Sequence, residues 1–307
     1  MVDILLATYN GETYLKEQIE SILKQTYEEW ILYIRDDGSK DNTIKTVKRY
    51  VDKYPEKIKF IEDNKSSLGA KMNFGELIKC SKNDYCMFCD QDDFWLPNKI
   101  EITLLKMREL EEKYGKKEPI LIHTDLKVVD ENLNIINNSF WKYMNLNYKK
   151  NNLNFMITQN IVTGCTMMIN KSLVDVVEAI PTECYMHDWW IGLVASVFGK
   201  IDSVNEGTIL YRQHYNNEIG AKKENLINIL TNKIRNRSKI EVFESEIKQM
   251  KKFFDIYNDK LNGNYETLIK DFISIRSKGA IERRIILIKN RIFHNDIIIN
   301  IKNIIFI

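Results

Sequence analysis

The sequence predicts an α/β fold that is followed by a helical C-terminal region. Strand and helix patterns alternate as far as Pro119, which is typical of β-α-β units and of a mostly parallel sheet covered by helices. Short polar clusters rich in Asp, Asn and Gly follow the aliphatic segments, as turns after strands do. Beyond about residue 222, Gly and Pro become rare and apolar residues recur at helical spacing.

Four strand patterns occur in the first half, and each is followed by a helical pattern. The first strand ends at the turn pair Asn10-Gly11, after which Tyr14 and Ile19 lie on one helical face. Asp41 suits the N-cap of the second helix, and Pro97 suits the first turn of the fourth. The predicted strands are residues 3–8, 30–34, 57–61 and 85–89, and the predicted helices begin near residues 14, 41, 70 and 97.

After Pro119 the pattern changes to strands and short irregular pieces, which predicts a mixed second half that completes the sheet. Strands are expected at residues 120–129, 166–169 and 201–212, and an apolar helix is expected after His187. We therefore predict a catalytic domain over residues 1–220 and an α-helical region over residues 221–307.

Composition and charge exclude several classes of protein. The 307 residues are 44% hydrophobic and 29% charged, as in a globular chain that buries a core. The formal charge of +2 gives no indication of a nucleic-acid partner. We expect a cytoplasmic location, because no secretory signal pattern or long apolar run is visible and five cysteines are too few for a disulfide scaffold. Cys86 and Cys89 form a lone CxxC in an apolar run, where buried thiols are expected rather than zinc ligands.

Polar side chains gather where three predicted strands end: at Thr8-Tyr9-Asn10, at Asp36-Asp37 and at Asp90-Gln91-Asp92-Asp93. Ligands of open α/β sheets bind outside the carboxyl ends of the strands, so these clusters are expected to converge on one crevice. Asp90 and Asp92 offer carboxylate oxygens, which suit Mg²⁺ or Mn²⁺ held partly by substrate phosphates. Tyr9 could stack on a planar base, and Asp37 could accept from a uracil or thymine N–H. Each cluster also fits plain turn chemistry, and the residues alone leave both readings open.

Two further clusters lie downstream. In His187-Asp188-Trp189-Trp190, the carboxylate could be only a partner of the helix dipole, whereas adjacent tryptophans form a platform of the kind that binds a sugar face. Tyr211-Arg212-Gln213-His214 places an imidazole and a guanidinium at another strand end. A structural role and a ligand role both remain open for His214.

These clusters stand in the same order as the motifs of a known family, together with Leu68-Gly69-Ala70-Lys71-Met72-Asn73-Phe74. They resemble family 2 glycosyltransferases, which are inverting enzymes with the GT-A fold, a nucleotide-diphospho-sugar transferase fold with a Rossmann-like mixed sheet. The subgroup they resemble most is the bacterial rhamnosyltransferases of cell-surface polysaccharide synthesis. The resemblance covers residues 1–220, and the C-terminal third carries no matching motif.

The resemblance implies a role for each matching position in binding a nucleotide-sugar donor. Asp37 would read the pyrimidine edge, and Lys71 and Asn73 would lie near the diphosphate or ribose. The remaining residues implied to contact the nucleotide-sugar are Thr8, Tyr9, Asn10, Glu12, Asp90 and Gln91.

The resemblance also implies the residues of the reaction itself. Asp90 and Asp92 would form a DxD-type motif, with Asp92 as the direct metal ligand and His214 completing the metal or diphosphate site. Asp188 would be the general base. The residues implied to contact the acceptor are Trp95, Trp189 and Trp190. One departure is His187, because the residue before the base is commonly Glu.

The implied reaction moves a sugar onto a saccharide acceptor carried on polyprenyl diphosphate. The donor expected first is dTDP-L-rhamnose, and a UDP-hexose (galactose, glucose or N-acetylhexosamine) is the alternative. A divalent cation would offset the charge of the leaving diphosphate, and inversion needs only one base. A nucleotidyltransferase is a rival, but it would need a glycine-rich phosphate loop that Tyr9-Asn10-Gly11-Glu12 does not supply. A non-catalytic sugar-nucleotide-binding protein is a second rival, and it would tolerate Asp188→Asn.

The C-terminal region mixes aliphatic residues with Lys and Arg, including Lys233, Arg283, Arg284 and Arg291. A basic amphipathic helix can lie on the anionic inner face of the cell membrane. The alternative is packing against the catalytic domain or another subunit, as in a homodimer, and packing is the favoured expectation. Residues 297–307 are β-branched enough to leave helix and strand both open.

Overall fold

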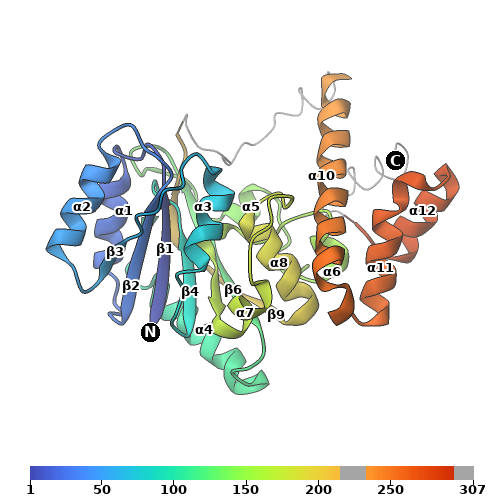
Figure 1. The fold of residues 1–307 in the computed structure, drawn as a ribbon, viewed down its shortest axis with the longest axis horizontal. Helices are drawn as coiled ribbons and strands as arrows, with labels where there is room; N and C mark the ends of the chain where they lie inside the picture. Colours follow the sequence, from blue (N-terminus) through green and yellow to red (C-terminus); the bar gives the residue numbers. More distant parts are fainter. Residues whose placement is uncertain (215–232, 294–307) are drawn as a thin grey trace.

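The computed structural model of the chain describes residues 1–214 and 233–293 (Figure 1). The described residues form one nine-stranded sheet in the order β3-β2-β1-β4-β8-β6-β9-β5, with β7 paired to β6. The strands are β1 Val2–Thr8, β2 Trp30–Asp36, β3 Ile58–Phe60, β4 Tyr85–Cys89, β5 Phe94–Trp95, β6 Ile120–Val129, β7 Ile135–Asn137, β8 Met168–Asn170 and β9 Lys200–Arg212.

The helices mostly follow the strands, as the alternating pattern predicts. In the first two thirds of the chain they are α1 Leu15–Leu23, α2 Thr43–Lys53, α3 Gly69–Ile78, α4 Lys99–Tyr114, α5 Phe140–Tyr143, α6 Leu153–Met156, η1 Gly164–Thr166, α7 Lys171–Val177 and α8 His187–Phe198. The C-terminal helices are α10 Lys233–Tyr257, η2 Asn258–Lys260, α11 Gly263–Ile273, η3 Ile275–Ser277 and α12 Ala280–Lys289.

The first half of the sheet is parallel. β1 pairs with β2 on one side and with β4 on the other, and β2 pairs with β3. All seven residues of β1 are buried, because helices cover both faces of a central parallel strand. This explains why β1 reads as a nearly continuous aliphatic run rather than as an alternating one.

The second half of the sheet is mixed, as predicted. β8 runs antiparallel to β4 and β6, β9 runs parallel to β6, and β5 runs antiparallel to β9. The strand predicted at residues 166–169 is partly wrong, because Gly164–Thr166 form the 3₁₀ turn η1 and β8 begins only at Met168. The strands β5 and β7 were not expected, since two or three residues are too few to show a period.

Two apolar clusters lie on opposite faces of the sheet. Alternate residues of β1 divide between them: Ile4 and Leu6 pack under α1, α2 and α4, whereas Leu5 and Ala7 pack under α3 and α8. All five cysteines are free and four of them are buried, so the prediction of buried thiols at Cys86 and Cys89 is confirmed.

The C-terminal helices pack against the same cluster as α8. The Phe253 ring of α10 lies 5.6 Å from the Trp190 ring of α8, and Phe272 of α11 packs against Phe243 of α10. In Figure 1, α10 stands beside α8 and separates it from α11 and α12. The favoured expectation of packing against the catalytic domain is therefore confirmed for these helices. The domain boundary near residue 220 and residues 297–307 lie outside the described part of the chain.

Among the helices that the structure describes, none is both long enough and apolar enough to cross a membrane.

Candidate active site

The expected convergence of the strand-end clusters follows from the sheet register. Thr8 lies opposite Asp36, so the chain leaves β1 and β2 at the same level of the sheet. The loops then bond to each other. The Gln91 side-chain amide accepts from the Tyr9 N–H and donates to the Tyr9 carbonyl, both at 2.9 Å. The Asn10 N–H donates to Ser39 Oγ at 2.7 Å. Hydrogen bonds thus join loops that are 82 residues apart in the chain.

Asn10 and Glu12 hold the loops together. Asn10 adopts a left-handed conformation with φ of 47°, and its Oδ1 accepts from the Lys40 N–H at 2.9 Å. Glu12 Oε2 accepts from the backbone and side-chain N–H groups of Asn42, at 2.6 and 2.9 Å. The Tyr9 side chain is 51% exposed, as a ring that stacks on a base must be. The exposed ring of Tyr9 is thus compatible with the stacking role predicted for it.

Thr8 and Asn73 are buried beneath these loops. Their exposures are 1% and 2%, and the Thr8 hydroxyl donates to Asp36 Oδ2 at 2.9 Å. The Asn73 amide donates to the Thr8 and Arg35 carbonyls, and its Oδ1 accepts from Arg35 at 2.9 Å. Local hydrogen bonds engage the buried polar groups of both side chains, and their contact with a nucleotide stays a prediction.

Asp37 and Lys71 are also engaged within the protein. The Asp37 carboxylate is 4% exposed and accepts from the Leu68 and Gly69 N–H groups at 2.9 and 2.8 Å, at the start of α3. Lys71 donates to the Thr182 and Cys184 carbonyls at 2.6 and 2.7 Å. The roles expected for Asp37 at the pyrimidine edge and for Lys71 near the diphosphate or ribose stay predictions, and these bonds show that both side chains also have partners within the protein.

An acidic cluster follows β4, and it includes one residue that the sequence motif did not single out. Asp90, Asp93 and Cys165 each place a ligand atom within 4.8 Å of the others. Asp93 is fully buried, and burial together with the charges of Asp92 and Asp90 raises its carboxyl pKa well above the ordinary value. The third acid in the run at residues 90–93 was the available signal, but plain turn chemistry accounts for it equally well.

Asp92 and His214 meet as the sequence predicts. His214 Nε2 lies 2.9 Å from Asp92 Oδ2, and the imidazole packs against the Tyr14 ring at 4.9 Å. The contact joins residues 122 positions apart, across the ends of β4 and β9. It places one carboxylate and one imidazole next to the acidic cluster.

Arg212 anchors this arrangement, a role that the sequence did not reveal. The guanidinium is 2% exposed, donates to the Asp92 carbonyl at 2.9 Å and pairs with Glu17 at 2.6 Å. Its backbone N–H donates to Asp93 Oδ1 at 3.2 Å, and its side chain also lies 4.3 Å from the centre of the Tyr14 ring. The end of β9 is thereby fastened to the acidic loop.

The oxygen ligands of this cluster fit a divalent cation such as Mg²⁺ or Mn²⁺. Asp93 Oδ2 is buried and has no hydrogen-bond partner among the described residues, which is costly for a carboxylate unless a proton or a cation neutralises it. The hard oxygens of Asp90, Asp92 and Asp93 are the ligand type that these ions prefer, and His214 adds a nitrogen. Burial raises the Cys165 thiol pKa well above its usual value, so this sulfur stays protonated.

Asp188 lies in the first turn of α8 with a partly exposed side chain. Its Oδ2 accepts from the Gly164 N–H at 2.9 Å, and its Oδ1 accepts from the Trp189 N–H at 2.6 Å. Burial raises the carboxyl pKa to about 6, although these two hydrogen bonds oppose the shift. A carboxylate with such a pKa can take up a proton near neutral pH.

The turn η1 links Asp188 to the acidic cluster. Gly164 bonds to Asp188, and the next residue, Cys165, lies in the cluster with Asp90 and Asp93. Asp188 and the acidic cluster therefore contact consecutive residues of the same turn. The His187 imidazole packs against Gly164 of this turn and stacks on the Phe74 ring, with the two ring centroids 4.1 Å apart. Burial lowers its imidazole pKa to about 3, so His187 is neutral.

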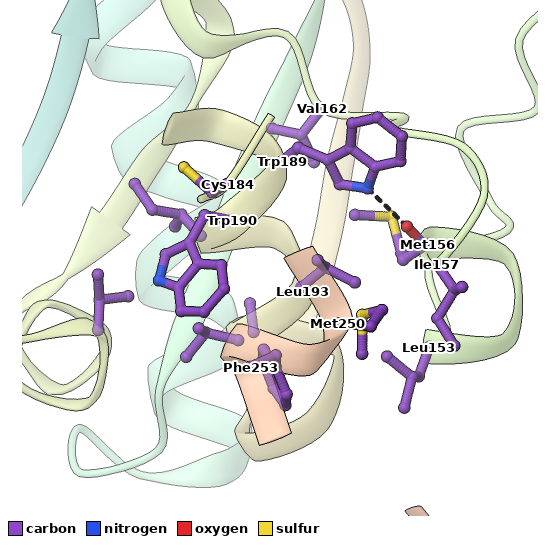
Figure 2. Packing of buried hydrophobic residues seen from close by; sticks show 14 of the residues in the cluster. Leu153, Met156, Ile157, Val162, Cys184, Trp189, Trp190, Leu193, Met250 and Phe253 are labelled. Atoms are coloured by element: carbon purple, nitrogen blue, oxygen red, sulfur yellow. Dashed lines mark hydrogen bonds between the residues drawn. The ribbon is translucent and has the colours of Figure 1, made fainter. Parts of the chain in front are cut away.

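The three tryptophans do not form an exposed platform. Trp95 and Trp190 are fully buried and Trp189 is 7% exposed, with its indole N–H donating to the Met156 carbonyl at 2.6 Å. Figure 2 shows Trp189 directed toward Met156 and Trp190 above Phe253. Trp189 and Trp190 fill the core between α8, α6 and α10, and Trp95 belongs to the apolar cluster on the opposite face of the sheet. Contact of these rings with an acceptor sugar stays a prediction, which their burial does not support.

The fold and the site define a class of α/β protein with an acidic cluster at the ends of its strands and a carboxyl of raised pKa in the first turn of α8. Residues 3–177 match the family described as Glycosyl transferase family 2, and the chain belongs to this family.

Three curated relatives of this chain are named as a glycosyltransferase, a rhamnosyl transferase and a glucosyltransferase. An uncharacterized glycosyltransferase of Rickettsia felis is 27% identical over 232 residues, which are 73% of this chain and 35% of the relative. The dTDP-rhamnosyl transferase RfbG of Shigella flexneri is 28% identical over 70% of this chain and 74% of its own length. The Escherichia coli UDP-Glc:alpha-D-GlcNAc-diphosphoundecaprenol beta-1,3-glucosyltransferase WfgD is 29% identical over 57% of this chain and 62% of its own length. The chain therefore spans only about a third of the length of the Rickettsia felis relative.

Solved structures support the GT-A fold. Residues 1–349 of S. aureus TarS in complex with UDP-GlcNAc superpose with a TM-score of 0.55 at 16% identity, over 94% of this chain and 80% of that one. The mannosyltransferase PcManGT of Pyrobaculum calidifontis, in complex with GDP-Man and Mn²⁺, gives 0.54 at 12% identity, over 94% of this chain and 73% of that one. The predicted fold class is thereby confirmed.

Proposed function

We propose that this chain transfers a sugar from a nucleoside-diphosphate donor to a hydroxyl group of a saccharide, with inversion at the anomeric carbon. The observation that supports the proposal is that Asp188 and the acidic cluster contact consecutive residues of η1. Gly164 bonds to Asp188, and Cys165 lies against Asp90 and Asp93. A base beside an acidic, cation-binding site is what the displacement of a diphosphate by a hydroxyl requires.

Asp188 is the proposed general base. The acceptor oxygen bonds to the anomeric carbon as the bond to the diphosphate breaks, and Asp188 takes the hydroxyl proton. The pKa of about 6 keeps this carboxyl ionised at neutral pH and still basic enough to accept the proton. One base suffices because a single displacement gives inversion.

The acidic cluster is the proposed site of Mg²⁺ or Mn²⁺. Asp90, Asp92, Asp93 and His214 would hold the ion. When bound there, it supplies positive charge against the leaving nucleoside diphosphate. The Mn²⁺ present with the Pyrobaculum calidifontis mannosyltransferase supports this proposal. Tyr9 would stack on the nucleotide base.

For the donor we propose dTDP-L-rhamnose, and the name of the Shigella flexneri relative supports this choice. A UDP-hexose is the second candidate. It is supported by the donor printed in the name of the Escherichia coli relative and by the UDP-GlcNAc bound to TarS.

The proposed acceptor is a saccharide on polyprenyl diphosphate, in capsule, cell-wall or O-antigen synthesis at the inner face of the cell membrane. The diphosphoundecaprenol in the name of the Escherichia coli relative supports this acceptor class. We propose residues 1–220 as the catalytic domain and residues 221–307 as a helical region that packs on it.

A comparison of donors tests the proposal. Release of nucleoside diphosphate is measured with dTDP-L-rhamnose, UDP-glucose and UDP-N-acetylglucosamine, each with and without Mn²⁺. Turnover with dTDP-L-rhamnose supports the rhamnose donor, whereas turnover with UDP-sugars alone supports the second candidate. Binding without turnover of any donor, with an acceptor present, contradicts the transferase proposal. Release of inorganic pyrophosphate from a nucleoside triphosphate and a sugar phosphate would indicate a nucleotidyltransferase instead.

A further inference from the structure

Helix α12 carries apolar residues on two faces. Ile286 and Leu287 face inward and are 9% and 3% exposed, whereas Ile281, Ile285 and Ile288 are 72%, 55% and 55% exposed. These three positions are spaced i, i+4 and i+7, so they form one stripe along the helix. We call these three residues the α12 stripe. A row of exposed isoleucines marks an interaction surface more often than isolated apolar residues do.

Basic side chains border the α12 stripe. Arg284, Lys289 and Arg291 are exposed. At 3.6 residues per turn, Arg284 lies on one side of the stripe and Lys289 on the other. Residues 275–293 contain one acidic residue, Glu282, and its carboxylate accepts from the Gly279 N–H at the start of the helix. The basic residues of this segment are Arg276, Lys278, Arg283, Arg284, Lys289 and Arg291. Acids on neighbouring helices balance part of this charge, because Lys289 lies 3.7 Å from Asp271 of α11 and Arg276 lies 2.7 Å from Glu244 of α10.

The α12 stripe lies at the margin of the molecule. Figure 1 shows α12 next to α11 at the outer edge, on the side opposite α2. The inward face of α12 packs into the apolar cluster that also contains Phe272 of α11. The helix is therefore held by its inner face and presents the stripe outward.

We propose that the α12 stripe docks onto an anionic membrane surface, with α12 lying in the plane of the interface. The isoleucines would enter the boundary between headgroups and acyl chains, and the flanking Arg and Lys side chains would meet lipid phosphates. Charge argues against a second copy of this chain as the occupant, because the same basic borders would then face each other. Docking needs no sugar donor, so this inference is independent of the proposed transfer reaction.

Co-sedimentation of the full chain with vesicles tests the proposal. Vesicles of phosphatidylcholine with 30% phosphatidylglycerol, roughly the anionic fraction at which polybasic segments bind, are compared with pure phosphatidylcholine. The stripe variant Ile281→Ser/Ile285→Ser/Ile288→Ser should lower the partition coefficient by more than about tenfold. The border variant Arg284→Gln/Lys289→Gln should lower it by roughly thirtyfold, and the wild-type coefficient should fall as NaCl is raised.

A matched control uses exposed isoleucines elsewhere. Ile135 and Ile136 of β7 are 55% and 51% exposed, and Ile135→Ser/Ile136→Ser should leave vesicle binding unchanged. Circular dichroism checks that each variant is folded, and the border variant tests the proposal even if the stripe variant does not fold.

Three results would overturn the proposal. The first is equal binding to both kinds of vesicle. The second is no wild-type binding to either kind, with dimers that dissociate in the stripe variant, which would identify a second copy as the occupant. The third is no binding together with a lower unfolding temperature of the stripe variant, which would show that the chain itself covers the stripe.

Discussion

Replacement of Asp188 by Asn gives the sharpest test of the proposed chemistry. Asn has nearly the same shape as Asp, and its Oδ1 can still accept one of the two N–H groups that bond to the carboxylate, from Gly164 and Trp189. It cannot take a proton from a hydroxyl group. Since general base catalysis contributes roughly 10²–10⁴-fold, kcat should fall by that factor while the dissociation constant for the donor changes little.

The pKa of Asp188 sets the expected pH dependence. Burial raises this pKa from 3.8 to about 6, so the wild-type kcat/KM should fall about tenfold per pH unit below pH 6 and level off above pH 7. The residual activity of Asp188→Asn should lack this limb. Transfer is followed by release of nucleoside diphosphate between pH 5 and 8, and donor binding is followed by calorimetry.

The same shift predicts a change in stability. A carboxyl whose pKa is raised on folding stabilises the fold most below pH 3.8 and loses this contribution as pH rises through 6. The two pKa values differ by about 2.2, which corresponds to roughly 3 kcal/mol in the free energy of unfolding. About 1 kcal/mol of this is lost between pH 5 and 7. Urea unfolding of Asp188→Asn should lack this part of the pH dependence.

A control and two refuting outcomes complete the test. Asp175 of α7 is exposed and pairs with Lys171, so Asp175→Asn should leave activity and its pH profile intact. The assignment fails if Asp188→Asn keeps more than about a tenth of wild-type kcat, a loss too small for a general base. It also fails if the variant and the wild type share one pH profile.

Three further predictions concern the cation, the turn η1 and the core. His214→Ala should raise the Mn²⁺ concentration needed for half-maximal activity by at least roughly tenfold, because His214 lies 2.9 Å from Asp92; an unchanged Mn²⁺ titration would exclude it from the cation site. Gly164→Ala would place a Cβ 2.9 Å from His187 Nε2 and should lower kcat, and Gly164→Ala/His187→Ala should recover part of the loss; equal loss in both variants would contradict this steric account. Trp190→Ala should cost about 3–5 kcal/mol in urea unfolding because the indole is fully buried, and a cost under about 1 kcal/mol would mean that Trp190 is not a core residue.

Local patterns in the sequence predicted the succession of strands along the chain, apart from β5 and β7, and most of their bounds. The predictions for residues 85–89 and 120–129 coincide with β4 and β6, because aliphatic runs bounded by turn residues leave little choice of end points. The placement of the acidic clusters also followed, since residues that succeed parallel strands emerge at one edge of a sheet. The contact between Asp92 and His214 is the strongest success of that reasoning.

Only the tertiary structure decided which polar and aromatic residues face solvent. In the sequence, Trp189 and Trp190 fit a sugar platform and a core equally well. Phe253 of α10 packs on Trp190 and Met156 of α6 binds Trp189, so both rings belong to the core. The burial of Asp93 and the raised pKa of Asp188 likewise depend on segments far away in the chain. Periodicity and turn chemistry act over a few neighbouring residues, whereas burial and pKa depend on everything that surrounds a group in space. A single chain can therefore show where its strands end, but not which of the side chains at those ends remain open to a ligand.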